Sequence, residues 1–192
     1  MDYVDRQQLK MGGDTVKAHP DFQAPWIRQL LSDPHLSWTK QVPRPENTTN
    51  AMFEKTLSGS DKIKAHLSFN RPTKEREASR PLEECFLMSI GQGIDGKTGR
   101  AHGGFNALIL DQISGSCAHH ANPDALPPAT ATMTTDYRLP VSTPCVVLAR
   151  AWMIRAEGRK MWINSVLEDS EGKVLASAKT LFIRARQEDA KL

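Results

Sequence analysis

The stretch with the strongest chemical character is residues 102–111, which read HGGFNALILD. Two glycines, Gly103 and Gly104, open a run that is apolar nearly all round, and Asp111 lies inside that run. Burying an ionised carboxylate is costly unless the group is paired or used in a reaction. Asp111 is therefore a candidate functional residue on physical grounds.

The glycine pair and the acid have complementary chemistry. The first-turn N–H groups of a helix have no intrahelical partner, so a helix that begins at Gly103 can bind a developing oxyanion. His102, just before this helix, can donate a hydrogen bond to a carbonyl or shape the turn. Asp111 can act as a general base on water or as a nucleophile. Together these groups can hydrolyse an acyl group.

Spacing limits how Gly103 and Asp111 can act together. They lie eight residues apart, which at 1.5 Å per helical residue is roughly 12 Å and too far for both to contact one carbonyl. Two subunits with antiparallel neighbouring helices would bring the glycines of one to Asp111 of the other. If both groups are catalytic, we expect at least a dimer with interfacial sites. The alternative is that the glycines only permit close packing and that Asp111 is a paired core residue.

The elements that must position this stretch fall into two unlike halves. Residues 1–80 are polar and interrupted by proline, and we expect short helices at 22–32 and at 50–69, the second split by Gly59. Residues 81–192 form the main domain, and its expected elements are a strand at 85–90, a glycine-rich loop at 91–101, a helix at 103–120, and strands at 129–138, 144–156, 160–169 and 173–186. This order predicts an α+β fold with an antiparallel sheet wrapped around one long helix.

The glycine-rich loop contains a misleading motif. Residues 91–98 match the P-loop pattern GxxxxGK[ST], and residues 91–96 match GxGxxG. A P-loop needs a helix that begins at its lysine, so that backbone N–H groups and the helix dipole hold phosphate. Lys97 instead runs into further glycines, and nine residues up to Ala107 are too few for a crossover to a parallel strand. We therefore reject nucleotide hydrolysis.

Composition excludes several classes of protein. The 192 residues are 39% hydrophobic and carry a net charge of +3, too mild to indicate nucleic-acid binding. Cys85, Cys117 and Cys145 are widely spaced in apolar runs, which is typical of buried reduced thiols, and no Cys/His cluster indicates a metal site. The sequence shows neither a signal peptide nor a run long enough to span a membrane, so we expect a cytoplasmic protein, its organelle left open.

Three sequence blocks together resemble one family. HGG followed by an aspartate nine residues after the histidine is similar to hotdog-fold acyl-CoA thioesterases of the phenylacetate-pathway and mammalian thioesterase-superfamily type. Residues 130–140, TATMTTDYRLP, resemble the strand after the central helix in that family, with its Tyr-x-x-Pro ending. The third block, residues 157–182, resembles the last two hairpins. The resemblance covers about residues 81–186.

The resemblance implies a hotdog domain at 81–192 behind an N-terminal extension, and it implies roles for five residues. Asp111 would be the general base or nucleophile, and the Gly103 amide, with Gly104, would polarise the thioester carbonyl. His102 would support the carbonyl or the loop, and Thr130 would orient the water. CoA would lie near the interface of a homodimer, with no cofactor beyond this part of the substrate. Its phosphates would meet basic residues, for which the candidates are Arg138, Arg155, Arg159 and Lys160.

One departure from the family opens a second interpretation. Many relatives place Asn or Gln about six residues before the HGG histidine, whereas this sequence reads GKTGR at 96–100. The contact with the thioester is then missing or is supplied by Gln92. The first expectation is a thioesterase that cleaves acyl-CoA or acyl-carrier-protein thioesters. The alternative is a non-hydrolytic hotdog protein that binds an acyl ligand or catalyses dehydration or cyclisation. Residues 1–80 would cap the acyl tunnel or extend the fold.

Overall fold

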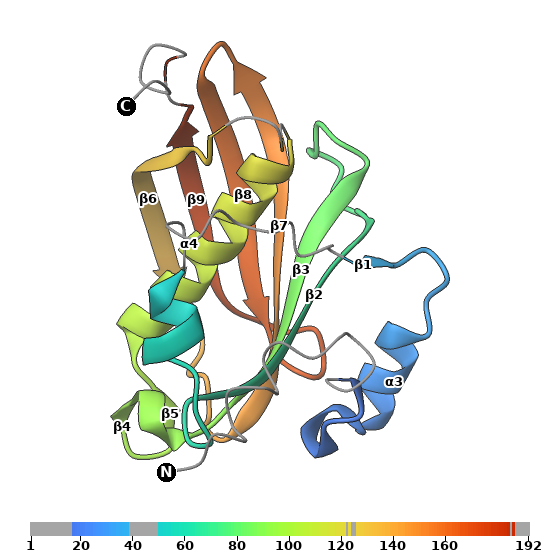
Figure 1. The fold of residues 1–192 in the computed structure, drawn as a ribbon, viewed down its shortest axis with the longest axis vertical. Coiled ribbons are helices and arrows are strands. Elements are labelled where there is room, and N and C mark those ends of the chain that lie inside the picture. Colours follow the sequence, from blue (N-terminus) through green and yellow to red (C-terminus); the bar gives the residue numbers. More distant parts are fainter. Residues whose placement is uncertain (1–16, 39–49, 122, 124–125, 185, 187–192) are drawn as a thin grey trace.

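The computed structural model describes residues 17–38, 50–121, 123, 126–184 and 186. Within these ranges an antiparallel sheet of seven strands runs in the order β1-β2-β3-β7-β8-β9-β6 (Figure 1). The strands are β1 Ser37–Trp38, β2 Ile63–Pro72, β3 Leu82–Ile90, β6 Ala129–Tyr137, β7 Cys145–Glu157, β8 Lys160–Glu168 and β9 Val174–Ile183. A separate hairpin consists of β4 Asp95–Lys97 and β5 Arg100–Ala101, and it follows the short 3-10 turn η3, Gln92–Ile94.

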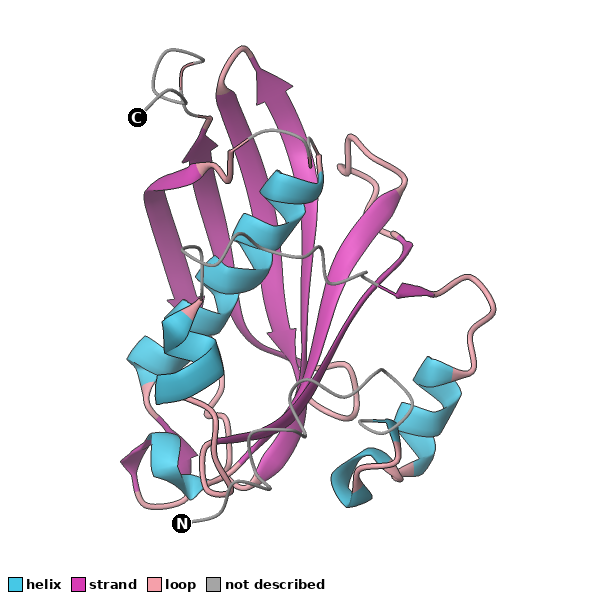
Figure 2. Cartoon of the chain, viewed as in Figure 1, coloured by secondary structure: helices cyan, strands magenta, loops and turns pink. Residues whose placement is uncertain are grey.

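The long helix α4, Gly103–His120, lies along the inner face of this sheet (Figure 2). Its sequence places apolar side chains three and four residues apart, which puts Phe105, Ile109 and Ile113 in the core against the sheet. The opposite face of α4, which includes Asp111, is half-buried. A sheet wrapped around one long helix is the hotdog fold, so the predicted α+β architecture is confirmed.

The N-terminal residues cover the other face of the sheet. The turn η1, Pro20–Phe22, and the helix α3, Pro25–Leu31, pack over β2, β3 and β7 (Figure 1). Phe22 and Ile27 are almost fully buried there against Leu87. Asp21 fixes this layer, because its carboxylate accepts a hydrogen bond from Ser89 and forms an ion pair with Lys64. Residues 17–38 thus form an outer layer, which covers the face opposite to α4.

Most predicted elements agree with the structure, and one does not. The strands after residue 81, α4 and the short helix within 22–32 are present with ends within a few residues of expectation; residue 185 of the last predicted strand lies outside the described residues. The helix predicted at 50–69 is wrong. Residues 52–56 form a single π-helical turn, η2 Met52–Thr56, and β2 follows as a strand paired with β3. Strands from both sides of residue 80 therefore belong to one sheet. The domain boundary proposed at residue 80 stays a prediction.

The three cysteines are unpaired thiols, as expected. Cys85 and Cys117 are buried, whereas Cys145 is only half-buried. Burial raises the pKa of the Cys117 thiol to about 12 and that of Cys145 to about 11. These thiols are protonated at neutral pH and are poor nucleophiles. In the described part of the chain, no helix combines the length and the apolar character needed to cross a membrane.

Candidate active site at the start of helix α4

His102 caps the N-terminus of α4. Its backbone is extended, with φ −62° and ψ 137°, and its Nδ1 accepts a hydrogen bond from the Gly104 N–H at 2.9 Å. A neutral His102 that accepts through Nδ1 carries its proton on Nε2, where it can still donate. The Gly103 N–H is the first of the helix and has no intrahelical acceptor. His102 therefore binds the Gly104 N–H, and the Gly103 N–H remains a donor that points out of the helix end.

Glycines around this cap are required by close contacts. A Cβ atom on Gly104 would lie 2.9 Å from His102 Nδ1, too close for a side chain. A Cβ atom on Gly96 would lie 2.9 Å from His102 Cδ2 and 3.0 Å from its Cα. A Cβ atom on Gly103 would meet the Tyr137 ring at 3.5 Å, an ordinary contact. Gly96 and Gly104 thus hold the cap, whereas position 103 has room.

Asp111 and Thr130 come together although 19 positions separate them in sequence. The Thr130 hydroxyl donates to Asp111 Oδ1 at 2.8 Å. Thr130 lies at the start of β6, where a β-bulge shifts the pairing with β9 between Thr130 and Thr132. Bulges of this kind redirect side chains at sheet edges. The structure thus brings Thr130, expected from the resemblance to orient the water, to Asp111 at the half-buried face of α4.

Gly103 and Asp111 are not brought together within one chain. Both lie on the continuous helix α4, so the rise of 1.5 Å per residue keeps them roughly 12 Å apart. The distance expected from the sequence therefore holds in the folded chain.

The four predicted phosphate contacts lie at opposite ends of the sheet. Arg138 is level with the start of β9, because its N–H donates to the Leu175 carbonyl. Lys160 is level with the other end, paired with Ile183. Eight strand residues separate these levels, roughly 26 Å at 3.3 Å per residue. The other two candidates, Arg155 and Arg159, lie beside Lys160 at the turn between β7 and β8.

Two of these side chains already have partners. Arg155 lies over the Trp162 ring at 3.9 Å and pairs with Glu157 at 3.4 Å. Arg159 donates to the Arg184 carbonyl at 3.0 Å. One chain therefore does not gather the four cations around a single phosphate.

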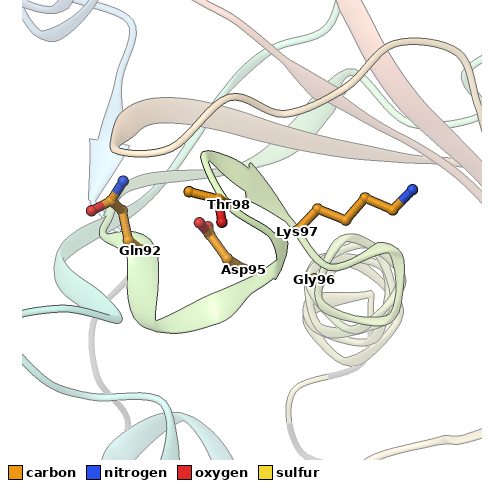
Figure 3. Close-up of a pocket in the computed structure, with 5 residues that line it drawn as sticks. All are labelled: Gln92, Asp95, Gly96, Lys97 and Thr98. Atoms are coloured by element: carbon orange, nitrogen blue, oxygen red, sulfur yellow. The ribbon is translucent and has the colours of Figure 1, made fainter.

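A small cavity of about 260 Å³ opens in the loop before α4, lined by Gln92, Asp95, Gly96, Lys97 and Thr98 (Figure 3). Asp95 holds this loop, since it accepts from the Gly99 N–H at 2.7 Å and from the Thr143 hydroxyl. Figure 3 shows Gln92 and Lys97 on opposite sides of the loop, with Gln92 on the side away from α4. Lys97 ends β4, and α4 begins only at Gly103, which agrees with rejecting the P-loop.

Two features of the site were not assigned from the sequence. Tyr137, 56% exposed, lies against Gly103 at the end of β6, although the sequence showed it only as part of the Tyr-x-x-Pro block. The contact between Gly96 and His102 has no sequence signal beyond the glycine itself. No group of three or more His, Cys, Asp or Glu side chains in the described ranges is placed to hold a metal ion.

Comparison with known proteins agrees with this geometry. Residues 98–176 match the model of the thioesterase superfamily. The acyl-coenzyme A thioesterase THEM4 of Mus musculus is 26% identical over 167 residues, which cover 77% of this chain and 70% of that protein. THEM4 of Xenopus laevis is 25% identical over 160 residues, covering 83% and 68%. The crystal structure of zebra fish thioesterase superfamily member 2 matches with a TM-score of 0.51 at 16% identity, over 60% of this chain and 81% of that one.

The fold and the family match agree with each other. The chain has the hotdog fold, and its residues 98–176 match the thioesterase superfamily. The resemblance to hotdog acyl-CoA thioesterases inferred from the HGG block and the two later blocks is confirmed.

Proposed function

We propose that this protein hydrolyses acyl-CoA thioesters at a site formed by Asp111, Thr130 and the Gly103 N–H. The observation that carries the proposal is the 2.8 Å hydrogen bond from the Thr130 hydroxyl to Asp111. A carboxylate held by a hydroxyl on an accessible helix face is suited to bind and deprotonate water. The two THEM4 relatives are named acyl-coenzyme A thioesterases, which supports this substrate class.

The reaction needs one proton transfer and one stabilised oxyanion. Asp111 takes a proton from a water bound beside Thr130, and the hydroxide attacks the thioester carbonyl carbon. The Gly103 N–H holds the oxyanion of the tetrahedral intermediate. The intermediate then breaks its C–S bond, and the CoA sulfur leaves and takes up the proton. Direct attack by Asp111 through an anhydride gives the same products and stays an alternative.

His102 and Gly104 determine the geometry of the helix start at this site. The Gly104 N–H is engaged by His102 Nδ1, so its contribution is to fix the cap that presents Gly103. The His102 Nε2–H remains available to a carbonyl oxygen. No cofactor is required, because water is the second reactant.

A homodimer completes the site. β6 is an edge strand, exposed along most of its length, and an unpaired edge favours pairing with another strand. A two-fold partner with an antiparallel α4 brings Gly103 of one chain to the partner subunit's Asp111. The same arrangement places the Arg138 end of one chain beside the partner's hairpin of Arg155, Arg159 and Lys160. We propose that CoA phosphates bind there.

The first test measures free thiol released from a panel of short, long and aryl acyl-CoAs. Asp111→Asn is expected to lower kcat at least about a hundredfold, the usual contribution of a general base, with an unchanged melting temperature. Asp33→Asn in the outer layer serves as a matched control with the same change of charge, and full activity is expected. An active Asp111→Asn protein would refute the proposed site.

A second test addresses the shared site. Gly103 is the first helical residue and His102 has the extended conformation that precedes proline, so Gly103→Pro removes the N–H and keeps the helix. Gly103→Pro and Asp111→Asn are each expected to be inactive. Mixing the two after unfolding and refolding gives heterodimers with one intact site, so activity returns to roughly a quarter of wild type for a random mixture. No recovery, or an active monomer, would exclude an interfacial site.

A non-hydrolytic hotdog protein is the second candidate function. Two observations favour it. Gly96 stands where relatives place Asn or Gln, and Gln92 lies on the side of the loop away from α4. Measurable acyl-CoA binding without thiol release across the panel would support it. The cytoplasmic location stays a prediction, and the three unpaired thiols are what a reducing compartment leaves.

A further inference from the structure

The side chain of Tyr137 lies beside the residue that starts α4. A Cβ atom built on Gly103 would lie 3.5 Å from Tyr137 Cε1, 3.6 Å from its Cζ and 3.9 Å from its hydroxyl oxygen. These atoms form the phenol end of the ring, so the outer end of the side chain reaches the start of the helix. The ring is therefore a neighbour of a thioester whose carbonyl accepts a hydrogen bond from the Gly103 N–H.

The register of β6 places this ring on the face of the sheet that α4 covers. The pairing of β6 with β9 is regular from Thr132 to Tyr137, so every second residue of this stretch shares a face. Met133 belongs to this set and packs against the core cluster that includes α4. Met133 and Tyr137 thus lie in one row along the helix, and Tyr137 ends the row at Gly103.

Tyr137 is the accessible end of this row. It is 56% exposed, and its hydroxyl forms no hydrogen bond with another residue that the structure describes. Single exposed apolar side chains are common on protein surfaces, but this ring borders a proposed oxyanion donor. An aromatic ring in that position can bury an apolar group of the substrate.

The two arms of the thioester differ in their chemistry. The pantetheine arm of CoA carries two amides, whereas the acyl arm is a hydrocarbon chain or an aryl group. Removing apolar surface from water is favourable in proportion to its area, while burying an amide without a hydrogen bond costs free energy. A row that consists of a thioether and an aromatic ring therefore suits the acyl arm.

We infer that Tyr137 is a specificity-determining residue, whose ring contacts the acyl group of the substrate beside the Gly103 N–H. This inference rests on the proposed thioesterase function and deepens it. The ring binds the acyl arm and takes no part in proton transfer. A long acyl chain buries more apolar area against the ring than an acetyl group does, so the wild-type protein prefers long acyl chains.

The test is the ratio of kcat/KM for decanoyl-CoA to kcat/KM for acetyl-CoA. A ratio measured on one sample does not depend on how much of that sample is folded. Tyr137→Ala is expected to lower the ratio about tenfold. A factor of ten is about 1.4 kcal/mol, which corresponds to roughly 55 Å² of lost apolar contact at about 25 cal/mol per Å². Tyr137→Phe keeps the ring and is expected to leave the ratio within about twofold.

Leu82→Ala is the matched control, because it also shortens an exposed apolar side chain. Leu82 is 48% exposed and lies two residues before Glu84, which contacts His120 at the other end of α4. Its ratio is expected to equal that of the wild-type protein. Melting temperatures check that all variants fold.

The outcomes separate this inference from the proposed function. An unchanged ratio in Tyr137→Ala, or a wild-type protein that prefers acetyl-CoA, would overturn the inference and leave the thioesterase assignment intact. Equal losses on both substrates would also overturn it, because the ring would then contact the CoA arm or support the helix start. A tenfold fall in Tyr137→Phe would assign the effect to the hydroxyl instead of the ring. A wild-type chain that hydrolyses no acyl-CoA would refute the proposed function and this inference with it.

Discussion

Gly96→Ala tests the contact that shapes the candidate site. The added methyl group would lie 2.9 Å from His102 Cδ2 and 3.0 Å from His102 Cα. The ring could turn aside, but the Cα belongs to the backbone of the helix cap. Either the loop or the start of α4 must move. The substitution should therefore affect both stability and catalysis.

The expected cost follows from two separate effects. Overpacking of a closely packed site costs about 1–3 kcal/mol, and loss of an N-cap hydrogen bond costs about 1 kcal/mol. The free energy of unfolding should thus fall by about 2–4 kcal/mol. For a domain of this size the melting temperature should fall by roughly 5–15 °C. A shifted cap also moves the Gly103 N–H, so kcat should fall at least about tenfold, as for a misplaced catalytic group.

The control is Gly99→Ala in the same loop. Gly99 has φ +73° and no heavy atom within 4 Å of a built Cβ, so its substitution tests backbone strain alone, about 1–2 kcal/mol. Urea unfolding and thiol release are measured for both variants at one pH and salt concentration. If Gly96→Ala proves no less stable and no less active than Gly99→Ala, the contact with His102 does not shape the site.

Two further predictions concern the outer layer. Phe22 is 1% exposed, so Phe22→Ala should lower the free energy of unfolding by about 3–5 kcal/mol. The kcat of the folded fraction should stay unchanged. A loss below about 1 kcal/mol in urea unfolding would contradict the described packing of Phe22. Hydrogen bonds from Lys64 and then Ser89 lower the pKa of Asp21, so its stabilisation is present above the ordinary carboxyl pKa of about 3.9 and is lost as pH falls through the lower folded value. Asp21→Asn should therefore be less stable than wild type at pH 7 by about 1 kcal/mol, a value reduced for partial exposure. The difference should shrink as the pH falls below the ordinary carboxyl pKa, whereas Asp33→Asn should match wild type throughout.

The comparison of sequence with structure shows which patterns carry information. Helix α4 was predictable because its apolar residues continue without proline from Gly103 and because two glycines mark its start. Strands β7, β8 and β9 were predictable from turn residues between apolar runs, and Gly158 and Gly172 indeed adopt positive φ. Local signals therefore fixed these elements without reference to tertiary contacts.

The failure at residues 57–69 has a specific cause. Grouping Leu57, Ile63 and Leu67 as one helical stripe ignored the intervening residues. From Ile63 to Asn70 apolar and polar residues alternate strictly, and in β2 the apolar side chains are buried while the polar set is half-buried. This period of two indicates a strand. The signal was present, and a longer-range helical interpretation obscured it.

Within the site, local spacing was informative and distant positions were not. The family resemblance singled out Thr130 and Asp111 separately, and their hydrogen bond forms where a bulge interrupts β6. The separation of Arg138 from Lys160 depends on strand register across β9 and β6, which no local pattern specifies. The contact of Gly96 with His102 likewise depends on how the loop folds back on the helix cap.

The outer layer of residues 17–38 has a consequence for the colloidal behaviour of the protein. It shields Leu67, Phe69 and Leu87, which lie on one continuous surface of the sheet. Detachment of that layer would leave α4 in place and expose an apolar patch on the opposite face of the sheet. Such a molecule would keep its active-site geometry but would aggregate. Proteolytic removal of the layer, or acidification, should therefore cause turbidity before it causes loss of turnover.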